Sequence, residues 1–246
     1  MPKKIKYLLF LIALIVIYLF ASHFYIYKII RMAGLKAVDD RHRYEINQNS
    51  QNKMIYVSLG DSLTSGAGAD KYEESYPYLL AARLSASDKH VINLNFSYPG
   101  ARTADVIRDL LPKAIIEQPD LVTLLIGTND IHGNVSFSET IKNYDFILQE
   151  LKAKTKAKVN VISVPFIGSQ TLLLPPYNWY FENKVLSLNR EILILCNKYG
   201  FHYIDLTTPT AEISREDGIY YSADKFHPAA TGYKMWSNII YDNINQ

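Results

Sequence analysis

The sequence of 246 residues contains one cysteine, Cys196, and therefore no intramolecular disulfide can form. Cys196 closes the apolar run that begins at Ile192, which predicts a small buried side chain rather than a reactive thiol. A domain of this size builds a sufficient core without disulfides. The lack of cysteine therefore neither supports nor excludes an extracytoplasmic location.

The sequence also lacks a strongly basic region outside its N-terminus. The net charge is +2, but residues 1–35 contain five basic residues and no acidic one, so the remainder of the chain carries a net charge of −3. The five basic residues are Lys3, Lys4, Lys6, Lys28 and Arg31. A mildly acidic remainder with scattered lysines argues against a nucleic-acid partner, which requires a basic stripe.

No formally charged side chain occurs in the 21 residues from Tyr7 to Tyr27. About 20 apolar residues are enough to cross a bilayer as a helix. We therefore predict that residues 1–28 form a single-pass membrane anchor. Aromatic residues at its far end, such as Phe24 and Tyr25, suit a boundary between lipid and water.

The flanking charges indicate the orientation of this segment in the membrane, and the residues around position 21 indicate whether it is cleaved. The three lysines before it predict a cytoplasmic N-terminus and an extracytoplasmic remainder, although two basic residues after it weaken that orientation. A cleaved signal peptide is the alternative. Leu19 and Phe20 make a poor cleavage site before Ala21 or Ser22, which favours an uncleaved anchor.

The chain changes character twice after the apolar segment. Residues 29–52 are polar with little periodicity, which predicts a linker or stalk. Residues 53–246 form one predicted domain in which β-rich runs alternate with helical patterns. We expect strands near 54–59, 90–96, 120–126, 158–164 and 202–206, and helices near 76–86, 103–116, 138–155, 180–199 and 229–244. Apolar strands of this kind are covered on both faces, which predicts a central parallel sheet between helix layers.

The tetrapeptide Gly60-Asp61-Ser62-Leu63 directly follows the first predicted strand. In open α/β sheets ligands bind at the carboxyl ends of strands, and small residues beside a serine let the chain turn sharply and expose the hydroxyl. An ordinary strand-ending turn is the alternative. A catalytic Ser62 would need a base, an orienting carboxylate and oxyanion donors, because a free serine hydroxyl is a poor nucleophile.

Two of the six histidines remain as candidate bases once those in the anchor, in the linker and at the amino ends of strands are set aside. His227 follows Asp224 by three residues, so a carboxylate on a tight turn can accept from Nδ1 while Nε2 faces the serine. A loop histidine before the last helix, with Pro228 in its first turn, is the alternative. His132 lacks such a carboxylate, and we expect it to border the pocket.

Two further polar turns follow predicted strands. Gly127-Thr128-Asn129-Asp130 places an amide side chain after the third strand, where it could donate to an oxyanion or form an Asx-turn. The segment from Asn95 to Gly100 follows the second strand and ends in a glycine whose backbone N–H can approach a substrate closely. Each of these segments alone is only a turn.

Together, and in order, these segments resemble the four blocks that define the GDSL, or SGNH, hydrolase family. The matching residues are Ser62 in Gly-Asp-Ser-Leu, Gly100 in Asn-x-Ser-x-x-Gly, Asn129 in Gly-Thr-Asn-Asp and His227 in Asp-x-x-His-Pro. The resemblance covers residues 54 to about 240. It implies a three-layer, flavodoxin-like α/β/α fold with a five-stranded parallel sheet, and a serine esterase that uses no metal or organic cofactor.

The resemblance also implies a role for each residue. Ser62 would attack an ester carbonyl, His227 would move its proton, and Asp224 would hold the imidazole. The backbone N–H groups of Ser62 and Gly100 and the side chain of Asn129 would bind the oxyanion.

The substrate is less constrained by the sequence. The irregular segment from Pro165 to Phe181 could floor an acyl pocket or act as a lid, or it could simply cover the edge of the sheet. Additional candidates for the substrate pocket are Asp61, Asp130, His132 and Trp179.

A membrane anchor favours an esterase, lipase or lysophospholipase at the outer face of a bacterial membrane. Such an enzyme would be a monomer whose partners are a small-molecule or lipid acyl ester and the membrane. A cell-envelope carbohydrate O-acetylesterase is the first alternative. A catalytically silent, tethered binding module is the second.

Overall fold

The computed structural model describes residues 2–33, 43–213 and 219–244. Within these ranges six strands form one sheet in the order β1-β3-β2-β4-β5-β6. Five of them run parallel and correspond to the five predicted strands. They are β2 (Lys53–Gly60), β3 (His90–Ser97), β4 (Leu121–Leu125), β5 (Lys158–Ile162) and β6 (His202–Ile204).

The sixth strand, β1 (Arg43–Ile46), pairs antiparallel with β3 at the edge of the sheet. Its Tyr44 is buried and stacks on Tyr72 with 4.2 Å between ring centroids. This strand lies inside the segment predicted as a linker, so part of that segment belongs to the domain. Residues 34–42 of the predicted linker lie outside the described residues.

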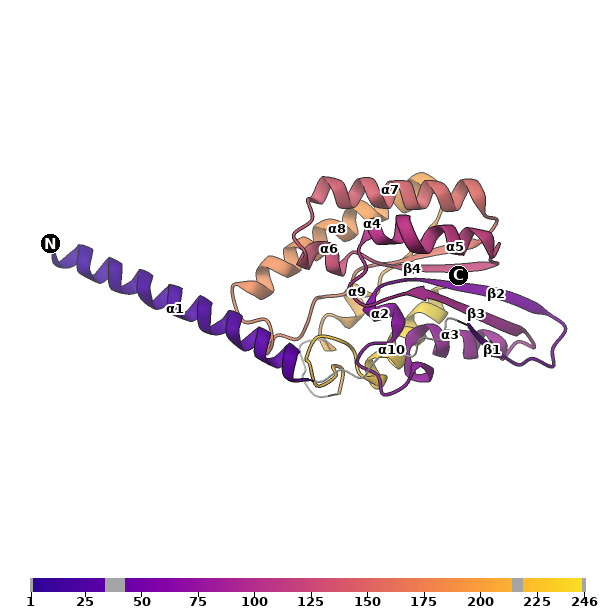
Figure 1. The fold of residues 1–246 in the computed structure, drawn as a ribbon, viewed down its shortest axis with the longest axis horizontal. Helices are drawn as coiled ribbons and strands as arrows, with labels where there is room; N and C mark the ends of the chain where they lie inside the picture. The colour runs from indigo at the N-terminus through magenta and orange to yellow at the C-terminus, as the bar shows by residue number, and fades with distance from the viewer. Residues whose placement is uncertain (1, 34–42, 214–218, 245–246) are drawn as a thin grey trace.

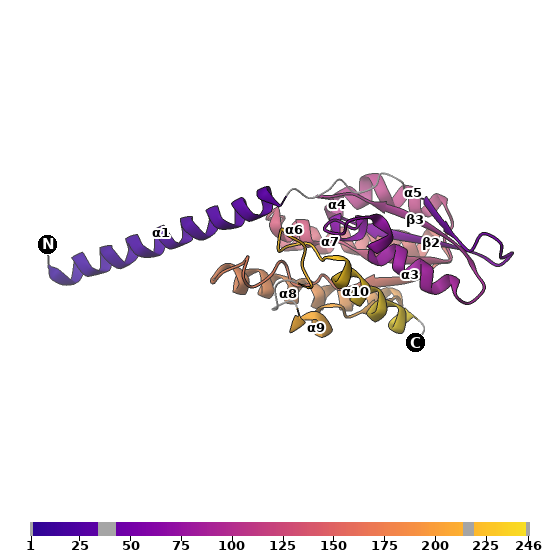
Figure 2. The same cartoon turned by 90° about the horizontal axis from the view of Figure 1, so that it is seen from below.

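Helices cover both faces of the sheet (Figure 1). On one face lie α3 (Tyr76–Ser85) and α10 (Ala230–Ile244), which run side by side (Figure 2). On the other face lie α5 (Leu111–Ile116), α7 (Phe137–Lys154) and α8 (Tyr177–Tyr199). Each layer has its own apolar core, because successive strand side chains point to opposite faces: Val57 joins one core and Tyr56 the other. The predicted three-layer α/β/α fold is confirmed.

The helix predicted over 103–116 is interrupted. It consists of α4 (Thr103–Asp105), a π-helical turn η2 (Val106–Leu110) and α5, and the N–H of Leu111 bonds five residues back to the Val106 carbonyl. Pro112 follows immediately and has no N–H to continue an α-helical ladder. The wider turn therefore accommodates the proline within one helical layer.

The N-terminal helix α1 (Lys3–Met32) projects away from the domain (Figure 1). Its length and composition make it a candidate to cross a membrane. Its C-terminal half contacts the domain along one side: Ile26 and Ile29 pack against the core, and the Tyr18 hydroxyl donates to the Pro175 carbonyl at 2.7 Å. α1 is therefore held against the domain over about three turns.

Candidate active site

Ser62 lies at the carboxyl end of β2, at the start of the short helix α2 (Ser62–Ser65). Asp61 caps this helix, since its Oδ1 accepts from the Leu63 N–H at 3.0 Å. A Cβ on Gly60 would lie 2.1 Å from the Thr64 Oγ1 and 2.4 Å from the Leu125 carbonyl oxygen. Only glycine lets the chain turn this tightly from strand to helix, and the turn leaves Ser62 7% exposed.

His227 joins Ser62 to Asp224 through two hydrogen bonds. The Nε2 of His227 lies 3.0 Å from the Ser62 Oγ, and its Nδ1 lies 2.5 Å from the Asp224 Oδ2. A carboxylate can only accept, so Nδ1 carries the proton and Nε2 is left to accept from the serine hydroxyl. The structure thus brings Ser62 together with His227, which lies 165 positions further along the chain, and with Asp224.

Asp224 is fully buried and its other oxygen is saturated with donors. Its Oδ1 accepts from the Ser222 hydroxyl at 2.7 Å and from the N–H groups of Phe226 and His227 at 2.9 Å each. Burial alone would raise the pKa of Asp224, but the hydrogen bond and charge of His227 and these N–H groups outweigh it and lower the pKa. The carboxyl is therefore ionised at neutral pH. Ser222 has no motif in the sequence that marks it.

Asn129 connects the loops that follow β2, β3 and β4. It lies in α6 (Thr128–His132), and its Nδ2 donates to the Ala101 carbonyl at 3.0 Å and to the Asp61 Oδ2 at 3.3 Å. Gly100 adopts a left-handed backbone with φ of 85°, and a Cβ there would meet no atom within 4 Å. An open space therefore lies beside Gly100, at the carboxyl ends of the parallel strands, where Ser62 and Asn129 also lie.

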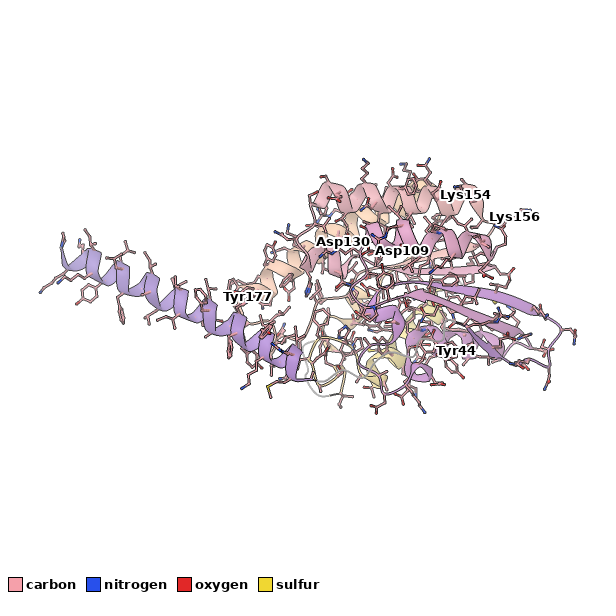
Figure 3. All side chains as sticks on the ribbon, in the orientation of Figure 1. Tyr44, Asp109, Asp130, Lys154, Lys156 and Tyr177 are labelled. Carbon is pink, nitrogen blue, oxygen red and sulfur yellow. The ribbon has the colours of Figure 1, made fainter. Side chains whose placement is uncertain are left out.

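Two further carboxyl groups near the carboxyl ends of the strands are buried. Asp130 accepts from the N–H of Thr103 at 3.0 Å and from its hydroxyl at 2.5 Å, so it holds the start of α4, and burial raises its pKa. Burial raises the pKa of Asp61 to about 7. Figure 3 shows Asp130 on the same side of the domain as the start of α8. Thr103 was not expected from the sequence, since it lies 27 residues from its partner.

His132 lies among aromatic side chains beside His227. Its ring stacks on Phe181 at 5.0 Å and meets the edge of Phe226 at 5.1 Å, and Phe226 contacts His227 at 4.8 Å. This packing and the neighbouring His227 lower the pKa of His132. His132 therefore borders the site, whereas Trp179 lies on the outer surface with 59% of its area exposed.

The segment from Pro165 to Phe181 contributes side chains both to the core and to two small hollows. Leu172 and Leu173 are buried in the core, while Phe166 and Ile167 line two small hollows. One hollow is lined by sequence neighbours of the site residues, namely Leu63, Thr128, Phe226 and Pro228. It has room for about one water molecule.

Cys196 is free and buried, as its apolar surroundings predict, and burial raises the pKa of its thiol to about 12. Among residues 2–33, 43–213 and 219–244, no three His, Cys, Asp or Glu side chains are grouped so as to hold a metal ion.

Residues 58–235 match the model of the GDSL-like lipase/acylhydrolase family. The chain belongs to this family. The matched range spans the whole site, from Asp61 to His227. Membership makes the chain an ester hydrolase of the esterase, lipase and acylhydrolase type, and the predicted family is confirmed.

Solved structures of GDSL-type and related esterases have the same fold. The lipase/acylhydrolase from Enterococcus faecalis gives a TM-score of 0.63 at 23% identity, over 78% of this chain and 95% of that one. A catalytic mutant of Axe2, an acetylxylan esterase from Geobacillus stearothermophilus, gives a TM-score of 0.64 at 17% identity, over 80% and 95%. The uncharacterized protein YpmR of Bacillus subtilis is 24% identical over 225 residues, which are 80% of this chain and 84% of YpmR.

Proposed function

We propose that this GDSL-family enzyme hydrolyses carboxylic acyl esters with Ser62 as its nucleophile. The observation that carries the proposal is the chain of hydrogen bonds from Asp224 to His227 at 2.5 Å and from His227 to Ser62 at 3.0 Å. The Ser62 Oγ attacks the ester carbonyl carbon while His227 Nε2 takes the hydroxyl proton, and ionised Asp224 stabilises the resulting imidazolium. His227 then protonates the leaving alcohol, and water releases the acyl group by the reverse sequence.

The oxyanion of the tetrahedral intermediate would be bound by the N–H groups of Ser62 and Gly100 and by the Asn129 amide. The open space beside Gly100 supports this position. Both N–H groups of the Asn129 amide have acceptors, so an oxyanion must replace one of them. The Asp61 Oδ2, at 3.3 Å, is the more distant acceptor and the one expected to give way. One such donor contributes about 10²–10³ in kcat.

The enzyme is proposed to act at a membrane, with α1 as an uncleaved anchor and the domain at the outer face. The length and apolar composition of α1 and its contact with the domain support this placement. A lipid acyl ester, such as a lysophospholipid, is then the leading substrate class. An O-acetylated envelope carbohydrate is the second candidate, supported by the acetylxylan esterases that share this fold.

A fluorophosphonate probe tests the nucleophile. It should label the wild type and not Ser62→Ala, and esterase activity should fall by at least about 10³ in that variant, because the covalent path is removed. Ser187→Ala, an exposed serine on α8, is the matched control and should be labelled normally. An unlabelled wild type that turns over no ester would make the chain a binding module instead.

A substrate panel separates the two substrate classes. It compares p-nitrophenyl esters from acetyl to palmitoyl with lysophospholipid vesicles and an O-acetylated glycan. Turnover of lysophospholipid and of the longer esters is expected for the lipid enzyme. Turnover of acetyl esters and the glycan alone would reject the lipid class and select the carbohydrate.

A further inference from the structure

Two aromatic side chains are exposed on the first turn of α8. Trp179 is 59% and Tyr180 47% exposed, and these two residues are called the aromatic turn below. Side chains of this size are mostly buried in soluble proteins, because each ring removes a large apolar area from water. An exposed pair therefore calls for a partner.

The aromatic turn lies beside α1. Pro175, four residues before Trp179, accepts the hydrogen bond from the Tyr18 hydroxyl at 2.7 Å, and Ile26 and Ile29 fix the following turns of α1 on the domain. Figure 3 shows Tyr177, the first residue of α8, next to the C-terminal part of α1. The position of the aromatic turn along the membrane helix is therefore defined.

The length of α1 sets the depth of this contact. Tyr18 precedes Tyr27, the outer end of the uncharged segment, by nine residues or about 13 Å of helix. If that segment fills the hydrocarbon core, Pro175 lies below its outer boundary. If the membrane instead ends before Tyr18, the residues from Lys3 to Ile17 give only about 22 Å, short of the roughly 30 Å required. An α1 that spans the bilayer must therefore include Tyr18 within it, and the hydrogen bond from Tyr18 brings the chain before α8 to the outer leaflet.

We propose that the aromatic turn inserts into the membrane surface, so that the domain docks on the bilayer as well as being tethered to it. The partner is the lipid interface, where Trp and Tyr side chains are preferred. Lys184, whose Nζ lies 5.5 Å from the Tyr180 ring, adds a positive charge that suits anionic headgroups. The inference rests on the proposed role of α1 as an anchor.

Docking in this orientation connects the bilayer to the site. Tyr180 contacts Phe181 at 5.3 Å, Phe181 stacks on His132 at 5.0 Å, and His132 meets Phe226 at 5.1 Å beside His227. This continuous row of rings provides an apolar surface from the membrane to the site. A lipid acyl ester could follow it without crossing open water.

Tryptophan fluorescence tests the insertion, because the chain has two tryptophans and Trp236 is 1% exposed within the core. The full chain is reconstituted in phosphatidylcholine–phosphatidylglycerol vesicles with and without brominated lipids. Brominated lipids should quench a substantial part of the wild-type emission, and Trp179→Phe should abolish that part. A tryptophan introduced as Ile116→Trp in the Trp179→Phe background is the control, since Ile116 is exposed at the opposite edge of the sheet. It should respond to aqueous iodide and not to brominated lipid.

Three outcomes distinguish the inference from the proposals on which it depends. Lipid quenching that Trp179→Phe removes supports docking. Protein that floats with vesicles but whose Trp179 is quenched only by iodide overturns docking and leaves the anchor intact. Protein that fails to float overturns both, while hydrolysis of p-nitrophenyl acetate by the same sample reports separately on catalysis.

Discussion

Asp61 lies between the nucleophile and the amide of Asn129 and is completely buried. One of its oxygens accepts from the Leu63 N–H and the other from the Asn129 amide, so it positions both α2 and the oxyanion donor. Burial raises its pKa from 3.8 to about 7, which means that the folded protein binds a proton that the unfolded chain releases above pH 4. The ionised carboxyl therefore costs stability at neutral pH and is retained for its hydrogen bonds.

The raised pKa of Asp61 makes the stability of the protein depend on pH, and the variant Asp61→Asn should remove that dependence. Because the pKa of Asp61 is raised in the folded protein, the stability that protonation of Asp61 contributes is fully present below about pH 4. This contribution is lost as the pH rises towards 7. The unfolding free energy of the wild type relative to Asp61→Asn should therefore fall by about 2–3 kcal/mol between pH 5 and pH 8. Denaturant unfolding at both pH values measures it.

Asp145→Asn is the control for this experiment. Asp145 bonds Lys198, which lowers the pKa of Asp145, so its contribution to stability is constant above about pH 5. The unfolding free energy of the wild type relative to Asp145→Asn should not change between pH 5 and pH 8. The same constancy for Asp61→Asn would contradict the raised pKa of Asp61.

Residue order along the chain predicted which side chains meet, because Ser62, Gly100 and Asn129 follow parallel strands and His227 precedes the last helix. It did not predict how buried carboxylates are used. The sequence predicts Asp61 and Asp130 as pocket residues, and in the structure they accept hydrogen bonds from Asn129 and Thr103. These partners follow other strands, in α6 and α4, and a single sequence contains no distances between such segments.

At the level of elements, the turn between β2 and α2 is the most constrained backbone in the site. In Gly60→Ala the new Cβ would overlap Thr64 and the Leu125 backbone, which cannot move away without disturbing β4. We expect a loss of about 3 kcal/mol or more in unfolding free energy and a larger loss of activity, because Ser62 is displaced. Thermal unfolding and p-nitrophenyl acetate hydrolysis measure the two effects.

Gly100→Ala is the matched comparison. No atom lies within 4 Å of its new Cβ, so only the left-handed backbone, with φ of 85°, is penalised, at about 1–2 kcal/mol. Equal losses of stability in the two glycine variants would show that overlap at Gly60 is relieved elsewhere.

Strands and long helices followed from hydrophobic pattern, and their predicted positions agree with the structure. The hydrophobic pattern did not predict two elements, β1 and η2. β1 has four residues, the shortest run in which alternation can be recognised, and it pairs with β3 while Tyr44 stacks on Tyr72. The π-helical turn η2 shares the periodicity of its neighbours, so only Pro112 indicated that the helical ladder must change there.

At the scale of the whole molecule, α1 ends on the side of the domain where the parallel strands end and the site lies (Figure 1). A flexible stalk would let the domain adopt any orientation relative to α1. Packing of Ile26 and Ile29 on the core instead fixes α1 relative to the domain. Composition predicted the helix, but its docking depends on a few side chains whose partners are distant in sequence.

Ile29 and Ile30 provide a matched test of this docking, because they are adjacent and chemically identical. Ile29 packs against the core and Ile30 is exposed. Ile29→Ala should lower the unfolding free energy by about 1–2 kcal/mol, less than for a fully buried isoleucine, and Ile30→Ala by under about 0.5 kcal/mol. Thermal unfolding of the full chain in detergent should show a Tm about 3–6 °C lower for Ile29→Ala. If both variants unfold at the wild-type temperature, α1 is not docked and the domain is free to swing on its tether.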